Sequence, residues 1–230
     1  LGKGCAMALA EEGCDLVINA RTASELEATA EEIRAAHQVN VVAIPGDITT
    51  VEIRNKILEA CPAPDILVTN AGGPAPGNFR TDTRERWLAA LEAQLLSHVE
   101  MITAVVDGMA ERKFGRIVNI TSQSVKMPVP NLGLSTAARM ALTGFSSTIC
   151  REVAPHNVTI NGLLPGPFDT DRLKGNFTHA AQVTGKPEDE LRNARMMENP
   201  SHRFGTAEEF GATCAFPVSY THLRAHETSA

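Results

Sequence analysis

The chain has 230 residues, of which 43% are hydrophobic and 21% charged, so it suits one globular domain with a sizeable core. Its net charge of −6 argues against a nucleic-acid-binding surface, and no apolar run approaches the roughly 20 residues of a membrane span. We therefore expect neither nucleic acid nor a membrane as a partner. The five cysteines are odd in number and form no C-x-x-C pair, which favours reduced thiols in a cytoplasmic protein over disulfides or zinc.

Apolar strand-like runs alternate with helical periods along the chain. We expect strands over residues 16–18, 39–44, 66–69, 116–120 and 158–164. We expect helices over residues 3–12, 22–37, 50–60, 83–112 and 136–154, with Gly108 as the point where the fourth could break. Near-continuous apolar strands separated by helices indicate an α/β fold with a parallel sheet covered by helices on both faces. Residues 1–216 therefore form a single predicted domain.

Two stretches depart from this alternation. Residues 171–203 are polar, rich in Gly and Pro and contain two weak helical patterns. Because they follow the carboxyl end of a strand, we interpret them as a substrate lid, with a surface insertion as the alternative. Residues 217–230 carry no apolar period and look unlike part of a selected fold. In this tail His222 and His226 have the spacing of metal ligands on a helix, but we expect no metal site.

Short motifs follow three of the predicted strands. Ser122 comes just after strand 116–120, Asn-Ala-Gly at residues 70–72 follows strand 66–69, and Pro-Gly-Pro-Phe-Asp-Thr at residues 165–170 follows strand 158–164. In an open α/β sheet, ligands bind outside the carboxyl ends of the strands. Each motif alone could be an ordinary turn. Together they predict a binding site at this edge of the sheet.

These motifs resemble those of the short-chain dehydrogenase/reductase family. In that family a catalytic Ser is followed thirteen residues later by the Tyr of a Tyr-x-x-x-Lys motif. Here the thirteenth residue after Ser122 is Ser135, and four further on stands Arg139. Gln94 falls where the family has a catalytic Asn, and the only tyrosine, Tyr220, lies in the tail. The frame of the motif matches, but two of its central residues differ.

The resemblance also implies which residues bind a dinucleotide. The family opens with T-G-x-x-x-G-I-G, and Leu1-Gly2 matches only the last pair. Asp47, with Ile48 beside it, matches the acid near the adenine, although a lone Asp is otherwise often a helix cap. The implied cofactor-binding residues are Leu1, Gly2, Arg21, Asp47, Ile48, Asn70, Ala71, Gly72, Arg139, Pro165, Gly166, Phe168 and Thr170.

The choice of cofactor follows from charge. An acid at the end of the second strand of this fold would bond a ribose diol and repel a 2′-phosphate. Here that strand ends Ile18-Asn19-Ala20-Arg21, with no acid and with a guanidinium suited to phosphate. We therefore predict a preference for NADP(H). NAD(H) is the alternative, in which case Arg21 is a solvated loop charge.

The resemblance implies a Rossmann-like, doubly wound sheet with strand order 3-2-1-4-5-6-7, of which this chain is a piece truncated at both ends. The family's first strand and its closing strand have no counterpart here. The first strand would lie between strands 16–18 and 66–69. Without it we expect two strand edges to lack a hydrogen-bonding partner.

The catalytic positions allow two hypotheses. In the family the Tyr exchanges a proton with the substrate oxygen, whereas Ser135 is a much weaker acid and Arg139 does not give up a proton in proteins. The first hypothesis is an NADP(H)-dependent oxidoreductase that reduces a 3-oxoacyl-like or other ketone, with Ser122 polarising the carbonyl and water, Lys126 or a substrate group supplying the proton. The alternative is a catalytically silent dinucleotide-binding sensor or partner subunit. The resemblance also implies a homo-oligomer, a dimer or tetramer, formed through helices 83–112 and 136–154.

Overall fold

The computed structural model describes residues 1–219, apart from the His179 side chain. Tyr220 and the His222/His226 pair lie outside them. The strands are β1 (Leu16–Ala20), β2 (Val41–Pro45), β3 (Ile66–Thr69), β4 (Gly115–Ile120) and β5 (Val158–Leu163). The helices are α1 (Gly2–Glu11), α2 (Ala23–Ala36), α3 (Val51–Ala60), α4 (Arg84–Leu91), α5 (Ser97–Glu111), α6 (Gly133–Val153), α7 (Asp171–Thr184), α8 (Glu188–Met197) and α9 (Ala207–Ala215). The alternation expected from the sequence is confirmed.

Every strand pair is parallel, but the strands form two sheets. β1 pairs with β2, and β4 pairs with both β3 and β5. Among residues 1–219 no strand pairs the facing edges of β1 and β3, as the resemblance led us to expect. β4 is buried along its whole length, whereas β1 and β3 are mostly half-buried. The strand ends therefore belong to two backbone ladders, which side-chain packing joins.

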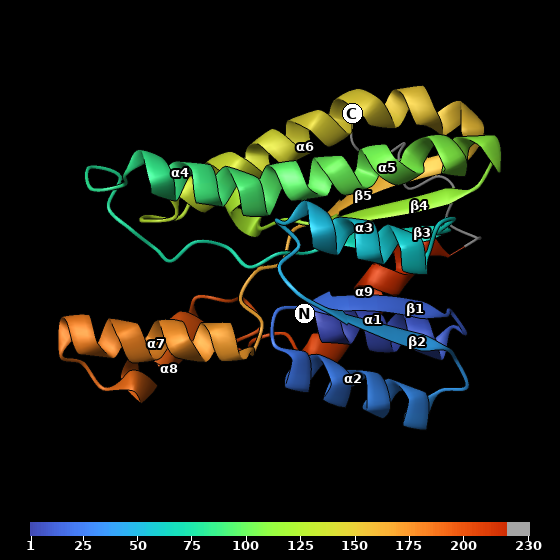
Figure 1. The fold of residues 1–230 in the computed structure, drawn as a ribbon. Coiled ribbons are helices and arrows are strands. Elements are labelled where there is room, and N and C mark those ends of the chain that lie inside the picture. The colour runs from blue at the N-terminus through green and yellow to red at the C-terminus, as the bar shows by residue number, and fades with distance from the viewer. Residues whose placement is uncertain (220–230) are drawn as a thin grey trace.

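Helices α1 and α9 provide that packing, and α9 lies between the two sheets (Figure 1). Cys5 and Leu9 of α1 join Phe210 and Cys214 of α9 in one apolar cluster with β4. The two helix backbones cross closely. A Cβ atom on Gly4 would lie 2.1 Å from the Ala207 carbonyl oxygen, and one on Gly211 would lie 2.2 Å from the Gly4 carbonyl oxygen. Only glycine fits at either position.

Helix α9 was not among the predicted helices, although a local signal marks its start. The Thr206 side chain accepts a hydrogen bond from the Glu209 amide (3.3 Å), and the Glu209 carboxylate accepts one from the Thr206 amide (2.9 Å). This Thr-x-x-Glu pattern is a capping box. The predicted domain boundary at residue 216 was also too early, because Val218 is buried in the same cluster as α9.

The predicted helix over residues 83–112 is interrupted, but not at Gly108, which lies within α5. A π-helical segment, η1 (Glu92–Leu96), separates α4 from α5. A π-bulge inserts an extra residue into a helix and is frequent at functional sites. By length and composition alone, Arg84–Glu111 could cross a membrane. However, Ile102, Val105 and Met109 pack on β4 and β5, as in a core helix of a globular domain.

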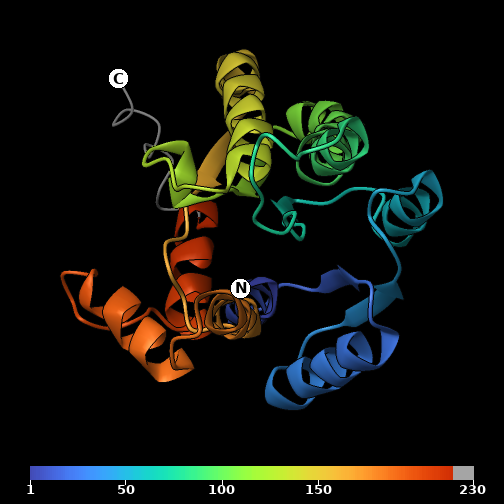
Figure 2. The ribbon, with the colours of Figure 1, turned by 90° about the vertical axis from the view of Figure 1, so that its left-hand side faces the viewer.

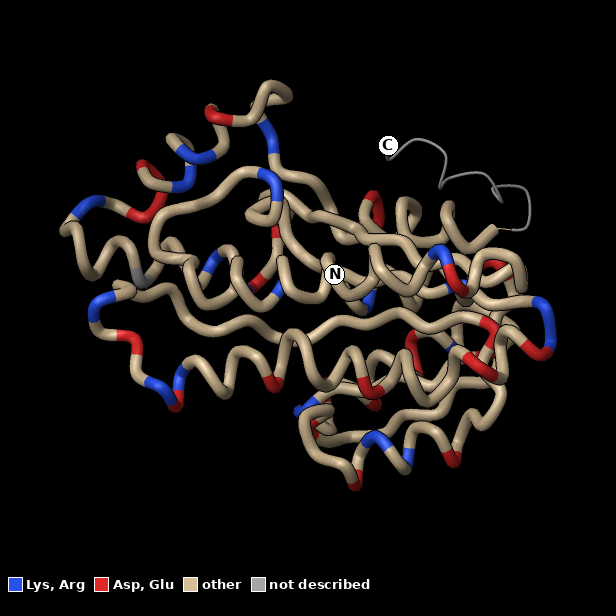
Figure 3. Tube along the Cα trace, turned by 90° about the horizontal axis from the view of Figure 1, so that it is seen from above, with Lys and Arg blue, Asp and Glu red and all other residues tan. Residues whose placement is uncertain are grey.

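Residues 171–203, which we interpreted as a lid, form helices α7 and α8. Both helices project away from the sheets, beside the N-terminus of α1 (Figures 1 and 2). Phe177 of α7 is buried against Phe204, which anchors this projection to the segment before α9. Charges of both signs are interspersed along it (Figure 3).

Candidate active site

The loops after β3, β4 and β5 meet at one edge of the fold. The Gln123 amide, next to Ser122, donates to the Pro165 carbonyl (3.0 Å), which joins the loops after β4 and β5. A Cβ atom on Gly166 would lie 3.0 Å from the Gln123 side-chain oxygen. The loop after β3 in turn reaches α1, since a Cβ on Gly2 would lie 3.1 Å from the Asn70 side-chain nitrogen. The loops that carry the predicted motifs therefore lie side by side at this edge of the fold, and we refer to the region over the strand ends that they border as the cleft.

One end of this cleft gathers the residues predicted to hold the adenosine half of the cofactor. The Arg21 guanidinium lies 3.7 Å from where a Gly72 Cβ would be, and it belongs to no ion pair among residues 1–219. Hydrogen bonds from the Thr49 amide and hydroxyl lower the pKa of Asp47, and the charge of Arg21 adds to this effect. An exposed guanidinium beside this loop fits the 2′-phosphate of NADP(H).

The first turn of α1 fits a phosphate group. Its N-cap residue, Leu1, has no side chain that can cap the first amide groups of the helix. Such amides at a helix N-terminus are a ready anion site. The small Gly2 lets a ligand come close to the backbone between α1 and Asn70. A dinucleotide could thus place its pyrophosphate here, with Arg21 on one side.

Ser122 is placed to donate a hydrogen bond. Its backbone is extended and caps the short 3₁₀ turn η2 (Gln123–Val125). The Ser122 hydroxyl oxygen accepts a hydrogen bond from the Ser124 amide (3.1 Å), which fixes the side chain at the carboxyl end of β4. Because the oxygen is held as an acceptor, its proton remains available to a ligand.

Gln94, Ser135 and Arg139 form a closed hydrogen-bonded ring, which we call the polar ring. With the Gln94 amide oriented to satisfy both its polar atoms, its nitrogen donates to Ser135 Oγ (3.0 Å) and its oxygen accepts from Arg139 Nη2 (2.9 Å). Arg139 Nε closes the ring on Ser135 Oγ (3.2 Å). Gln94 and Ser135 are only 1% and 8% exposed. The three positions that differ from the family motif thus bond to one another.

Arg139 also ties this ring to the strand that carries Ser122. Its Nη1 donates to the carbonyl oxygens of Ile120 (2.8 Å) and Thr121 (2.5 Å), at the end of β4. Burial, with a smaller effect from the charge of Arg172, lowers the pKa of Arg139 to about 10. The guanidinium therefore stays charged at neutral pH and acts as a fixed cation beneath the cleft.

His98 lies one helical turn after Gln94 and near Arg139. Burial, and then the charge of Arg139, lowers its pKa to about 4. Its Nδ1 lies 3.3 Å from the hydroxyl oxygen of Ser97. His98 is therefore neutral at physiological pH.

This histidine predicts a pH dependence of stability. In the unfolded chain His98 takes up a proton near pH 6.5, but in the folded chain it does so only near pH 4. The free energy of unfolding that is present above pH 6.5 is therefore lost progressively as the pH falls towards 4. The loss amounts to about 3 kcal/mol for a shift of this size. We expect urea unfolding between pH 7 and 4 to show this loss, and His98→Gln to flatten it. An equally steep loss in the variant would contradict this assignment.

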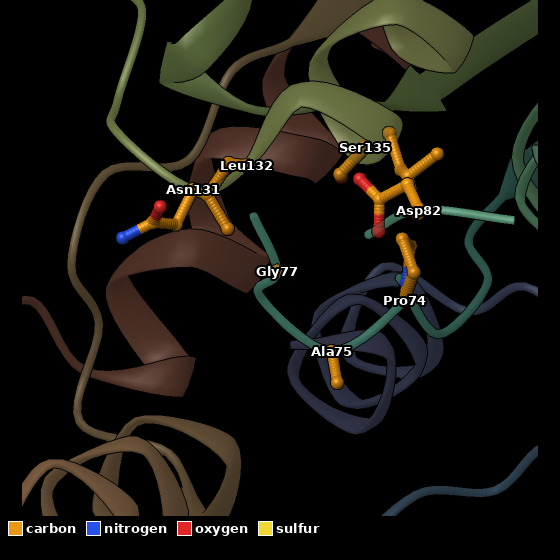
Figure 4. A pocket seen from close by; sticks show the side chains of 8 residues that line it. Pro74, Ala75, Gly77, Asp82, Asn131, Leu132 and Ser135 are labelled. Carbon is orange, nitrogen blue, oxygen red and sulfur yellow. The ribbon is translucent and has the colours of Figure 1, made fainter. Parts of the chain in front are cut away.

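A small, tight pocket lies next to the polar ring. Asp82 and Ser135 both line it, and Pro74, Ala75 and Asn131 are among the other lining residues (Figure 4). The Asp82 side chain is 3% exposed and pairs with Arg86. Asp82 was not predicted as a site residue, because an acid just before a helix normally indicates a cap. Thr83 is the cap here.

The turn after β5 carries the remaining predicted residues. Thr170 caps α7 by accepting a hydrogen bond from the Leu173 amide (3.3 Å). Phe168 pairs with Gly205 in a parallel bridge, and its ring packs edge-on against Phe210. The Phe168 side chain is thus a core anchor, which leaves only backbone of this residue for a ligand. Lys126, the proposed proton source, is exposed at the end of η2.

Known proteins match this architecture over nearly the whole chain. The family model of the short chain dehydrogenases matches residues 1–181. NADPH-dependent reductase BacG of Bacillus subtilis (strain 168) is 31% identical over 224 residues, which cover 95% of this chain and 86% of BacG. The 3-oxoacyl-[acyl-carrier-protein] reductase FabG of Vibrio cholerae is 27% identical over 219 residues, 95% of this chain and 85% of FabG. The crystal structure of YwfH, an NADPH-dependent reductase involved in bacilysin biosynthesis, superposes with a TM-score of 0.87 at 30% identity and covers 96% of this chain and 88% of YwfH.

The fold and the strand-end cleft define a dinucleotide-binding oxidoreductase of the Rossmann-like class. The chain belongs to the short-chain dehydrogenase/reductase family. The predicted family and fold are confirmed, and the predicted preference for NADP(H) agrees with relatives that are named for NADPH.

Proposed function

We propose that the protein is an NADP(H)-dependent reductase of a carbonyl substrate, either a 3-oxoacyl-like compound or another ketone. The observation that carries this proposal is the Ser122 hydroxyl. It is fixed at the end of β4 by the Ser124 amide, keeps its proton free, and lies beside the residue 165–170 turn. Bound NADPH would supply the hydride for the substrate carbon.

The residues of this chain would then position the substrate and stabilise the negative charge that develops on its carbonyl oxygen. Ser122 donates a hydrogen bond to the carbonyl oxygen and stabilises the negative charge that develops there. Arg139 holds the end of β4 in place and adds positive potential from below. Arg21 holds the 2′-phosphate, and residues 70–72 and 165–170 border the cofactor.

We further propose that solvent water supplies the proton. The carbonyl carbon gains the hydride, the oxygen gains a proton from water, and hydroxide leaves to the solvent. This route needs no tyrosine, whereas Lys126 remains the second source to be tested, because it stands four residues past Ser122.

The polar ring supports a second candidate function. Gln94, Ser135 and Arg139 bond to one another, and none of them is an acid suited to neutral pH. A dinucleotide-binding sensor or partner subunit without turnover would have such a site.

One experiment separates the two functions. NADPH and NADH binding is measured by fluorescence titration, and NADPH oxidation is followed with a panel of 3-oxoacyl thioesters, ketones and quinones. We expect tighter binding of NADPH and turnover with at least one carbonyl compound. In Arg21→Gln the preference for NADPH over NADH should fall, with Arg151→Gln as the control for charge. Tight NADPH binding without turnover on any compound would favour the sensor.

We also propose a homo-oligomer, a dimer or tetramer, in the cytoplasm. Large apolar side chains are exposed on the predicted interface helices, namely Trp87, Leu88, Leu96 and Met140. All five cysteines are free thiols, as a reducing compartment requires.

A further inference from the structure

Arg172, in the first turn of α7, reaches across the cleft. Its Nη1 donates to the Gly73 carbonyl and its Nη2 to the Pro74 carbonyl, both at 3.3 Å. Helix α7 follows β5, whereas Gly73 and Pro74 follow β3, so this side chain joins the two walls on either side of β4. Hydrogen bonds of 3.3 Å to neutral carbonyls are long and weak. The guanidinium can exchange them for a stronger acceptor.

The position of Arg172 places it directly over the polar ring. A Cβ atom on Gly73 would lie 3.0 Å from Arg172 Nη2 and 2.6 Å from the Gln94 amide. Gly73 therefore lies close to both side chains. Arg172 is also close enough to Arg139 for its charge to contribute to the lowered pKa of that residue, after burial. Two guanidinium groups thus face the same part of the cleft.

Nearby acids do not neutralise this charge, because each of them has another partner. Asp171 is fully exposed and pairs with Lys174, Asp169 pairs with Arg192, and Asp82 pairs with Arg86. Within residues 1–219, Arg172 itself forms no ion pair. The cleft beside the polar ring therefore carries an unbalanced positive charge.

We propose that Arg172 binds a carboxylate of the substrate, which makes the substrate class an oxo acid with a free acid group. This inference rests on the proposed function and deepens it. A carboxylate would replace two long bonds to carbonyls with a paired, charge-assisted contact from the guanidinium fork. The substrate carbonyl would then lie between Arg172 and Ser122.

Binding of acids and their esters tests this inference without turnover. The probes are 2-hydroxy and 3-hydroxy carboxylates of four to six carbons and their methyl esters, titrated by calorimetry into protein saturated with NADP⁺. We expect at least one acid to bind more tightly than its ester. The Arg172→Gln substitution should weaken the binding of that acid by about 10- to 100-fold and leave the affinity for the ester unchanged. Lys174→Gln, which removes the same charge from the same helix, should behave like the unaltered protein.

Three results would overturn the inference. If no acid binds more tightly than its ester, the site does not select a carboxylate. If Arg172→Gln weakens NADPH binding instead, the anion at this site is a cofactor phosphate. If Arg172→Gln weakens the binding of the acid and of its ester equally, Arg172 is only a structural link between the loop after β3 and helix α7. Carboxylate binding that depends on Arg172, together with no turnover on any carbonyl compound, would refute the reductase but not the carboxylate site.

Discussion

Replacing Arg139 with methionine is expected to lower the free energy of unfolding by about 3 kcal/mol. Methionine fills much of the space but donates no hydrogen bond. The variant removes the Arg139 donor from the carbonyl groups of Ile120 and Thr121 and from the oxygen of the buried Gln94 amide. Each buried polar group left unpaired costs about 1–3 kcal/mol. The variant also no longer has to bury the guanidinium charge, and this gain offsets part of the cost of the unpaired groups.

Urea denaturation of matched variants measures this effect. Arg151→Met removes an exposed arginine from the same helix and should change stability by less than about 0.5 kcal/mol. Arg139→Lys keeps the charge and a donor for the carbonyl groups, so we expect an intermediate loss. If Arg139→Met and Arg151→Met unfold at the same urea concentration, the polar ring does not stabilise the fold.

Ser122→Ala is expected to lower kcat/KM for the carbonyl substrate by about 10²- to 10³-fold, the usual effect of removing one donor to a developing oxyanion. The fold should tolerate the change, because alanine loses only the cap on η2, worth about 1 kcal/mol. The measurement is steady-state NADPH oxidation, with NADPH binding measured in parallel. We expect the binding to stay the same.

Ser124→Ala is the matched control for this variant. The Ser124 hydroxyl is buried and has no hydrogen-bond partner among residues 1–219, so its removal should leave stability unchanged or slightly raised. Its amide, which holds Ser122, is kept. Equal activity losses in the two variants would show that the loop geometry matters and that the Ser122 hydroxyl does not act on the substrate.

Much of the fold could be predicted because its signals are local. Buried strands such as Ile66–Thr69 form short apolar runs, and helices such as Val51–Ala60 have a 3.6-residue period. The π-helical segment, in which Gln94 is buried, could not be predicted, because no local pattern of the sequence marks it. Val218 was assigned to the tail because one apolar residue carries no period.

The candidate site was predictable only where it follows strand ends. Ser122 and residues 165–170 were expected at one edge because parallel strands present their carboxyl ends together, and the Gln123 amide does join the two loops through the Pro165 carbonyl. The ring of Gln94, Ser135 and Arg139 joins residues up to 45 positions apart, since 139 − 94 = 45, and no local pattern encodes those contacts. Arg172 was missed for a similar reason, because a single charge in a polar segment normally indicates a solvated surface.

The close crossing of α1 and α9 has a consequence for the loops that carry the candidate site. Helix α1 begins beside Asn70, in the loop after β3, while α9 packs with β4, which ends next to Ser122. At the crossing, a Cβ atom on Gly4 would lie 2.1 Å from the Ala207 carbonyl oxygen, so one added methyl group would push the two helices apart. The substitution of a single glycine outside the site would therefore change the spacing between the loops that form it.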